Sequence, residues 1–137
     1  MATNSAARII PETHRDLLQH ANIAHLATAR PDGALQSNPV WFEWDGEHIK
    51  ISQTKARQKM RNVKNDPHVA LSVVDPENPY RYLEVRGRVE RVEDDTDREF
   101  IDDLSQRYMG KPYPYHQPED QRVVVYIRPE DASSMAA

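Results

Sequence analysis

Five cationic side chains within ten residues form the part of this sequence best suited to chemistry: Lys55, Arg57, Lys59, Arg61 and Lys64. Arginine binds phosphate or carboxylate through a bidentate fork, while lysine supplies a compact point charge. The two residue types are interleaved here, which suits a small, multiply anionic ligand. The formal net charge of the whole chain is -4, so positive charge is concentrated locally in an acidic protein.

A helix is expected to carry these cations, beginning after Ser52, running to about Asn65 and ending before the Asp66-Pro67 pair. The hydroxyl of Ser52 or Thr54 is suited to capping its first turn. Helix starts expose unpaired N–H groups and the positive end of the backbone dipole, which attract anions. The helical start would therefore reinforce the cationic side chains.

The periodicity of this helix places Ala56, Met60 and Val63 on one side, where they are expected to face the core. One interpretation of the cations is a solvated helix that balances an acidic surface. Cations near a helix start oppose the dipole, however, and this cost favours a role in anion binding. A nucleic-acid module is the third interpretation, and the acidic net charge argues against it.

Six strands with short hairpins are expected around this helix, which predicts a mainly β fold: a small, mostly antiparallel barrel. The expected strands cover residues 23–29, 35–44, 48–52, 69–74, 80–92 and 122–128, with short helices at 11–20 and 94–109. Residues 31–33 and 45–46 have turn chemistry. Pro39 lacks an N–H and predicts a sheet edge or bulge, and Gly87 inside a strand predicts a bulge or a close backbone approach.

The length and composition of the chain limit the class of protein. A chain of 137 residues is the size of one domain, expected over 1–137 with its core at about 12–128. No apolar stretch approaches the roughly 20 residues that cross a bilayer, so no membrane span and a cytoplasmic location are expected. There is no cysteine, and the six histidines are scattered, so no metal site is expected. A short, polar, strand-rich chain is expected to complete its core as a homodimer.

As a whole, the sequence resembles the split-barrel flavin and deazaflavin oxidoreductases, the superfamily of pyridoxamine-phosphate-oxidase-like proteins. The nearer resemblance is to the branch that depends on the deazaflavin coenzyme F420. Residues 26–28 (LAT), 32–33 (DG), 39–42 (PVWF) and 84–87 (EVRG), together with the cationic helix, Asn62 and Asp66-Pro67, carry this resemblance. It covers roughly residues 12–128 and is specific as a whole rather than in any single piece.

The resemblance implies a six-stranded split barrel that forms a homodimer with two cofactor sites at the subunit interface. In such proteins, two strand ends line the tricyclic ring and the basic helix holds the cofactor phosphate. Arg122 matches a late arginine that reaches the site from the partner subunit. The cofactor-binding residues implied are Gln36, Ser37, Asn38, Pro39, Val40, Trp41, Ser52, Thr54, Lys55, Arg57, Lys59 and Arg122.

The function implied is hydride transfer between F420 and an unsaturated small-molecule acceptor, with no catalytic side chain assigned. FMN is the alternative cofactor, because it shares a phosphate and a tricyclic head. The C-terminal segment 122–137 lacks the tryptophan and arginine signature of true pyridoxamine phosphate oxidases, which argues against a vitamin B6 substrate. A carrier that holds the cofactor without turnover is a further alternative. Several late tyrosines, among them Tyr108 and Tyr113, are candidates for shaping a pocket for a flat substrate.

Overall fold

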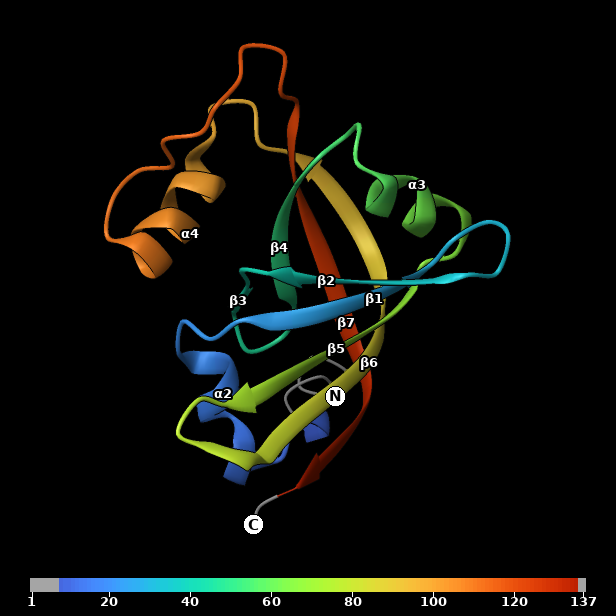
Figure 1. Ribbon diagram of the computed structural model, residues 1–137, viewed down its shortest axis with the longest axis vertical. Coiled ribbons are helices and arrows are strands. Elements are labelled where there is room, and N and C mark those ends of the chain that lie inside the picture. The colour runs from blue at the N-terminus through green and yellow to red at the C-terminus, as the bar shows by residue number, and fades with distance from the viewer. Residues whose placement is uncertain (1–7, 136–137) are drawn as a thin grey trace.

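The computed structural model describes residues 8–135, which form a mainly β structure around one antiparallel sheet of seven strands (Figure 1). The strand order is β2-β1-β5-β6-β7-β4-β3, so β2 and β3 are the two edges and the sheet is split rather than closed. The strands are β1 (Ala24–Ala29), β2 (Leu35–Val40), β3 (Glu43–Trp44), β4 (Ile49–Thr54), β5 (His68–Asp75), β6 (Asn78–Asp94) and β7 (Arg122–Met135).

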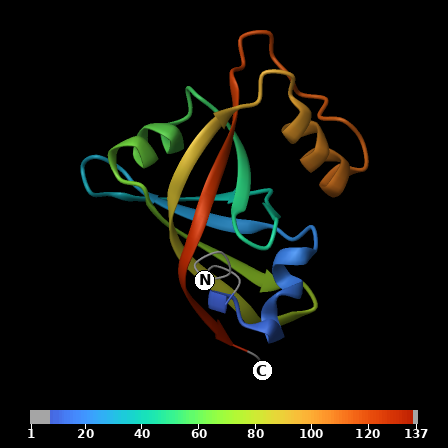
Figure 2. The ribbon, with the colours of Figure 1, turned by 180° about the vertical axis from the view of Figure 1, so that it is seen from behind.

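The helices are short and lie outside the sheet: η2 (Glu12–His14), α2 (Asp16–Gln19), α3 (Gln58–Asn65) and α4 (Glu99–Met109). In both views, α3 and α4 lie on opposite sides of the same end of the long β6–β7 ribbon (Figures 1 and 2). The short helix α2 lies toward the other end, where it contacts β3 and β5. No helix among residues 8–135 is long and apolar enough to cross a membrane.

The core forms because apolar residues alternate along the central strands. Ile49 and Ile51 of β4 are buried on the inner face, and their register partners on β7 are the buried Ile127 and Val125. Strand β5 has the same pattern, with buried residues alternating along its length. This alternation confirms that the strands predicted from sequence pack one face against a shared core.

The turn and edge predictions are confirmed. Gly33 has a φ of 88°, and the Arg30 N–H donates to the Ala34 carbonyl at 2.8 Å to close the β1–β2 hairpin. Pro39 lies on the edge strand β2, the kind of position in which a residue without an N–H is tolerated. At Gly87 the β6–β7 register shifts, and a Cβ atom there would collide with the carbonyl of Arg128. The close backbone approach predicted for this glycine is therefore present.

Several predicted boundaries were wrong, and the strand count is seven rather than six. The expected strand 35–44 is interrupted after Val40 and resumes as the two-residue β3. The cause is Tyr108, whose hydroxyl oxygen accepts from the N–H of Phe42 at 3.1 Å. That backbone N–H is thus bound to a side chain instead of a neighbouring strand.

The cationic helix also begins later than predicted. Strand β4 pairs with β7 as far as Thr54, opposite Arg122, so α3 starts only at Gln58. The N-cap is Arg57, and no side chain caps the helix, which corrects the capping role expected of Ser52 or Thr54. Ala56 precedes the helix and is exposed, contrary to the prediction that it faces the core. Met60 and Val63 of the same helix are buried as expected.

The helix predicted over 94–109 likewise starts later, at Glu99. Its first turn is held by Asp95, whose carboxylate accepts from the N–H groups of Phe100 and Ile101 at 3.1 Å. The segment predicted as one helix over 11–20 is divided into η2 and α2.

Candidate functional site

A cavity of about 420 Å³ opens between the end of β4, the first turn of α3 and helix α4. Its size falls within the range of roughly 300–1,000 Å³ typical of small-molecule sites. Its walls come from the end of β2 and Trp41, from β4, from α4 and from the start of β7. The lining residues are Ile23, Pro39, Val40, Trp41, Ser52, Gln53, Thr54, Arg57, Lys59, Ile101, Leu104, Tyr113 and Arg122.

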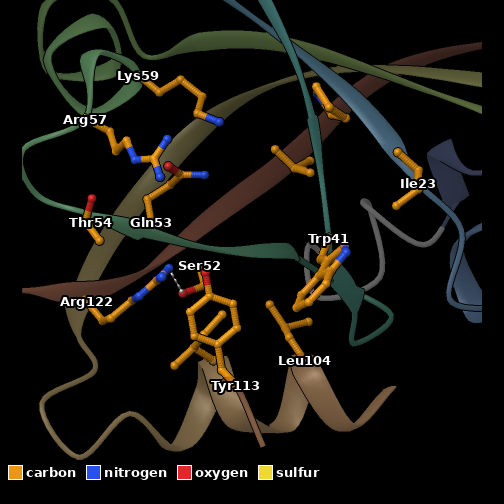
Figure 3. A pocket seen from close by; sticks show the side chains of 13 residues that line it. Ile23, Trp41, Ser52, Gln53, Thr54, Arg57, Lys59, Leu104, Tyr113 and Arg122 are labelled. Atoms are coloured by element: carbon orange, nitrogen blue, oxygen red, sulfur yellow. Dashed lines mark hydrogen bonds between the residues drawn. The ribbon is translucent and has the colours of Figure 1, made fainter. Parts of the chain in front are cut away.

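One end of this cavity is cationic. The side chains of Arg57, Lys59 and Arg122 gather there beside Thr54, as Figure 3 shows. Among residues 8–135, no carboxylate lies within salt-bridge distance of any of these three cations, whereas Lys50 and Lys55 bind Glu43 and Asp94 at 2.9 and 3.0 Å. Unpaired cations grouped in a cavity favour an anionic ligand.

Burial, and to a lesser degree the neighbouring charge of Arg57, holds the pKa of Lys59 below its ordinary value. Both causes penalise the charged ammonium group, and no acidic neighbour offsets them. A ligand phosphate beside Lys59 would relieve this penalty. Like the absence of salt bridges described above, the lowered pKa of Lys59 therefore favours an anionic ligand.

Arg122 is held at the cavity by weak contacts that leave part of its guanidinium free. Its Nη1 donates to the Ser52 hydroxyl at 3.4 Å, and its guanidinium carbon lies 4.9 Å from the centre of the Tyr113 ring. Its Nε is buried without a hydrogen-bond partner among the described residues. A buried donor of this kind is costly unless a ligand accepts from it.

The other end of the cavity is apolar and aromatic. Trp41 stacks on Tyr108 with ring centres 5.1 Å apart and planes inclined by 9°, and Tyr113 meets Trp41 edge to face at 6.2 Å. The Tyr108 hydroxyl donates its one proton to the carbonyl of Asn22 at 2.6 Å and accepts from the N–H of Phe42. Burial raises the pKa of Tyr108, which keeps this anchoring hydroxyl protonated. The aromatic wall is therefore fixed before any ligand binds.

Most of the residues expected at the site lie at this cavity: Pro39, Val40, Trp41, Ser52, Thr54, Arg57, Lys59 and Arg122. Four others do not line it. Gln36 and Asn38 hydrogen-bond to each other at 3.0 Å, Ser37 is exposed, and Lys55 pairs with Asp94. Their assignment as ligands stays a prediction, as does that of the cavity residues.

The expected site did not include five residues that line the cavity: Ile23, Gln53, Ile101, Leu104 and Tyr113. The tyrosine-rich loop had indicated Tyr113 only in general terms. Gln53 carried a sharper signal, because a polar residue follows Ile49 and Ile51 at the next inward-facing position of β4. The α4 residues could not be found, because the pairing of that helix with the cavity is a tertiary contact.

Comparison with known proteins identifies the family of the chain. A family model described as pyridoxamine 5'-phosphate oxidase matches residues 10–136. The chain belongs to this family. The pyridoxamine 5'-phosphate oxidase family is of oxidoreductase type, and membership confirms the resemblance seen in the sequence. No curated protein matches the chain.

Solved structures extend the comparison. A structure named F420 reductase is 47% identical, with a TM-score of 0.84, and the match covers 90% of this chain and 98% of that one. A conserved hypothetical protein of Mycobacterium tuberculosis is 22% identical, with a TM-score of 0.73 over 98% of this chain and 88% of that chain. General stress protein 26 of Bacillus anthracis is 20% identical, with a TM-score of 0.68 over 90% of this chain and 92% of that chain. The last two share the fold.

Proposed function

We propose that this protein is an oxidoreductase that binds coenzyme F420 and uses it to reduce an unsaturated small molecule. The observation that carries the proposal is the two-ended cavity: Arg57, Lys59 and Arg122 at one end and the Trp41–Tyr113 wall at the other. A phosphate joined to a flat tricyclic head has this same polarity. The 47% identical structure named F420 reductase supports the choice of deazaflavin.

The donor set fits such a cofactor. Arg57 and Lys59 would bind the phosphate, and the unpartnered Nε of Arg122 would donate to an oxygen close to it. Trp41, Leu104 and Ile23 would pack on the ring and keep water from it. The bound cofactor supplies the hydride, while the chain binds, orients and excludes water. This division explains a site without a catalytic dyad or triad.

A homodimer belongs to the proposal. Ile23 lies at the cavity, yet 44% of its surface is exposed, so an apolar part of the wall faces outward. A second copy that covers this side would complete the site and exclude water from the ring. The cofactor would then lie at the subunit interface.

Fluorescence titration with F420 and with FMN tests the proposal. We expect F420 to bind with micromolar or tighter affinity and FMN more weakly. Binding of FMN alone would move the protein to the flavin-dependent class that the family name also permits. Binding of neither cofactor would contradict the proposed function.

Turnover separates an enzyme from a carrier. Reduced F420 mixed with enones, quinones or tetrapyrroles should be oxidised steadily in the presence of the protein. The carrier alternative predicts tight binding with no oxidation above the rate without protein. Its motivation is that no residue is identified from the sequence as the proton donor for the acceptor.

A further inference from the structure

Gln53 occupies a position where the fold calls for an apolar residue. On β4 the inward-facing side chains are Ile49, Ile51 and then Gln53, of which Gln53 is 8% exposed. Its register partner on β7 is the buried Val123. A carboxamide thus continues a row of core residues at the end of the strand.

On the core side, the surroundings of Gln53 are mostly apolar. A void of about 10 Å³ lies there, and its lining apart from Gln53 and Lys59 is apolar: Leu26, Ile51, Met60, Val63, Val69, Val89, Val125 and Ile127. Among residues 8–135 no side-chain hydrogen bond is made by Gln53. The carboxamide is not among the fully buried, unpaired polar groups, so it is accessible from the cavity that Gln53 lines. A carboxamide that faces a cavity and has no partner among the described residues is available to hydrogen-bond a ligand.

The other side of Gln53 faces the large cavity. Its carboxamide points toward the cationic end, beside Arg57 and between Thr54 and Lys59 (Figure 3). We infer that Gln53 is a ligand-binding residue whose carboxamide hydrogen-bonds the bound cofactor at the hydroxyl-bearing chain next to its phosphate. This inference rests on the proposed function and adds a neutral contact to the cationic ones.

The chemistry of the carboxamide selects this part of the ligand. A carboxamide both donates and accepts, so it matches a hydroxyl group, which does the same. The phosphate oxygens are better matched by Arg57 and Lys59, which carry full positive charges. F420 and FMN each have a hydroxyl-bearing chain between phosphate and ring. A neutral group next to the cationic end is placed to bind that chain.

The variant Gln53→Met tests this inference, because methionine keeps the length of the side chain and removes both polar atoms. Two pairs of probes are titrated by fluorescence: F420 with its precursor that ends in a free alcohol, and FMN with riboflavin. For whichever cofactor the wild type binds, the variant should raise the Kd at least fivefold. The Kd of the matching probe without phosphate should rise at least fivefold as well. Lys59→Ala should instead weaken mainly the phosphorylated member.

Thermal unfolding of the ligand-free protein provides the second measurement. Gln53→Met should have a Tm equal to or above that of the wild type, since the substitution removes no hydrogen bond within the described residues and adds an apolar side chain beside the core. The matched control is Gln106→Met, an exposed position on α4 outside the cavity, which should change neither Kd nor Tm.

The outcomes separate the two proposals. If the wild type binds neither cofactor, the proposed function is wrong, and the role of Gln53 is wrong with it. If the wild type binds one and Gln53→Met binds it equally well, only the role of Gln53 is wrong. A clearly lower Tm for the variant would show that the carboxamide stabilises the fold itself, and would also overturn the inference.

Discussion

At the scale of single residues, the cations of the basic segment divide into two kinds. Lys55 lies 3.0 Å from Asp94 and serves the charge balance of the surface. Arg61 is bound to the side chain of Gln58 at 2.7 Å and to the carbonyl of Ala56 at 3.1 Å. Arg57 and Lys59 have no such partners among the described residues, and both line the cavity. We therefore expect individual side chains, rather than the whole run, to bind the anion.

The pair Lys59→Ala and Lys55→Ala tests this division. Removing the Lys59 ammonium should weaken F420 binding by about 1–3 kcal/mol, because one charge-assisted contact to phosphate is lost. Lys55→Ala should leave the affinity close to that of the wild type, since its charge is engaged with Asp94. Both dissociation constants come from fluorescence titration. Equal effects of the two substitutions would show that only the overall charge matters.

The lowered pKa of Lys59 predicts how binding depends on pH. Only the protonated ammonium attracts phosphate, so affinity should fall as the pH rises through the pKa of Lys59. Since that pKa is below the ordinary 10.5, the fall should begin earlier than for an exposed lysine. The measurement is the Kd for F420 across the alkaline range.

The variant Lys59→Arg is the control for this profile. Its guanidinium stays protonated throughout, so the alkaline fall should disappear. A fall of the same size in both proteins would assign the titration to another group.

At the scale of elements, helix α3 depends on one buried side chain for its position. Asn62 is fully buried and donates to the hydroxyl of Thr28 at 2.9 Å and to Gln36 Oε1 at 3.2 Å. It accepts from Gln58 Nε2 at 2.8 Å. A helix of eight residues without a side-chain cap gains little stability by itself, so this attachment to β1 and β2 sets where Arg57 and Lys59 lie.

The substitution Asn62→Leu should destabilise the fold by about 1–3 kcal/mol, because it leaves buried polar partners unsatisfied. Urea unfolding gives this free energy, and titration should show weaker F420 binding as α3 shifts. Asn65→Ala, at the exposed end of the same helix, is the matched control and should change neither value. A stable Asn62→Leu protein with unchanged affinity would contradict the positioning role.

At the scale of the whole molecule, the split sheet leaves the site bounded on some sides only. Strands β2 and β3 are its two edges, and Ile23 exposes part of the cavity wall. The exposed apolar side chains also include Leu35, at 82%. Exposed apolar surface beside a ligand cavity favours contact with a second copy.

We therefore predict a homodimer, which sedimentation equilibrium should reveal as twice the mass of the chain at micromolar concentration. Ile23→Asp should shift the equilibrium toward monomer and weaken F420 binding together, because the same surface serves both. The exposed substitution Val74→Asp, on β5 away from the cavity lining, is the control and should retain the wild-type affinity for F420. A wild-type monomer that binds F420 with full affinity would contradict the shared-surface prediction.

The sequence alone determined the local features, because these depend on neighbours in the chain. Alternating apolar residues predicted the strands, glycine and proline predicted the hairpin turn and the edge at Pro39, and Gly87 predicted a close approach. The motifs also indicated the family. Strand β3 and the start of α3 were mispredicted because Tyr108 and the β4–β7 pairing, both distant in sequence, decide them.

The tertiary structure alone decided which cations meet. Lys55 and Lys59 are four residues apart, and the sequence predicted the same role for both. Of the two, only Lys59 lines the cavity, whereas Lys55 pairs with Asp94. The reason is that β4 continues to Thr54 and α3 begins at Gln58, so the two lysines belong to differently oriented backbone. The meeting of Arg57 and Arg122 likewise depends on strand pairing between residues far apart in the chain. Local periodicity contains no information about such contacts.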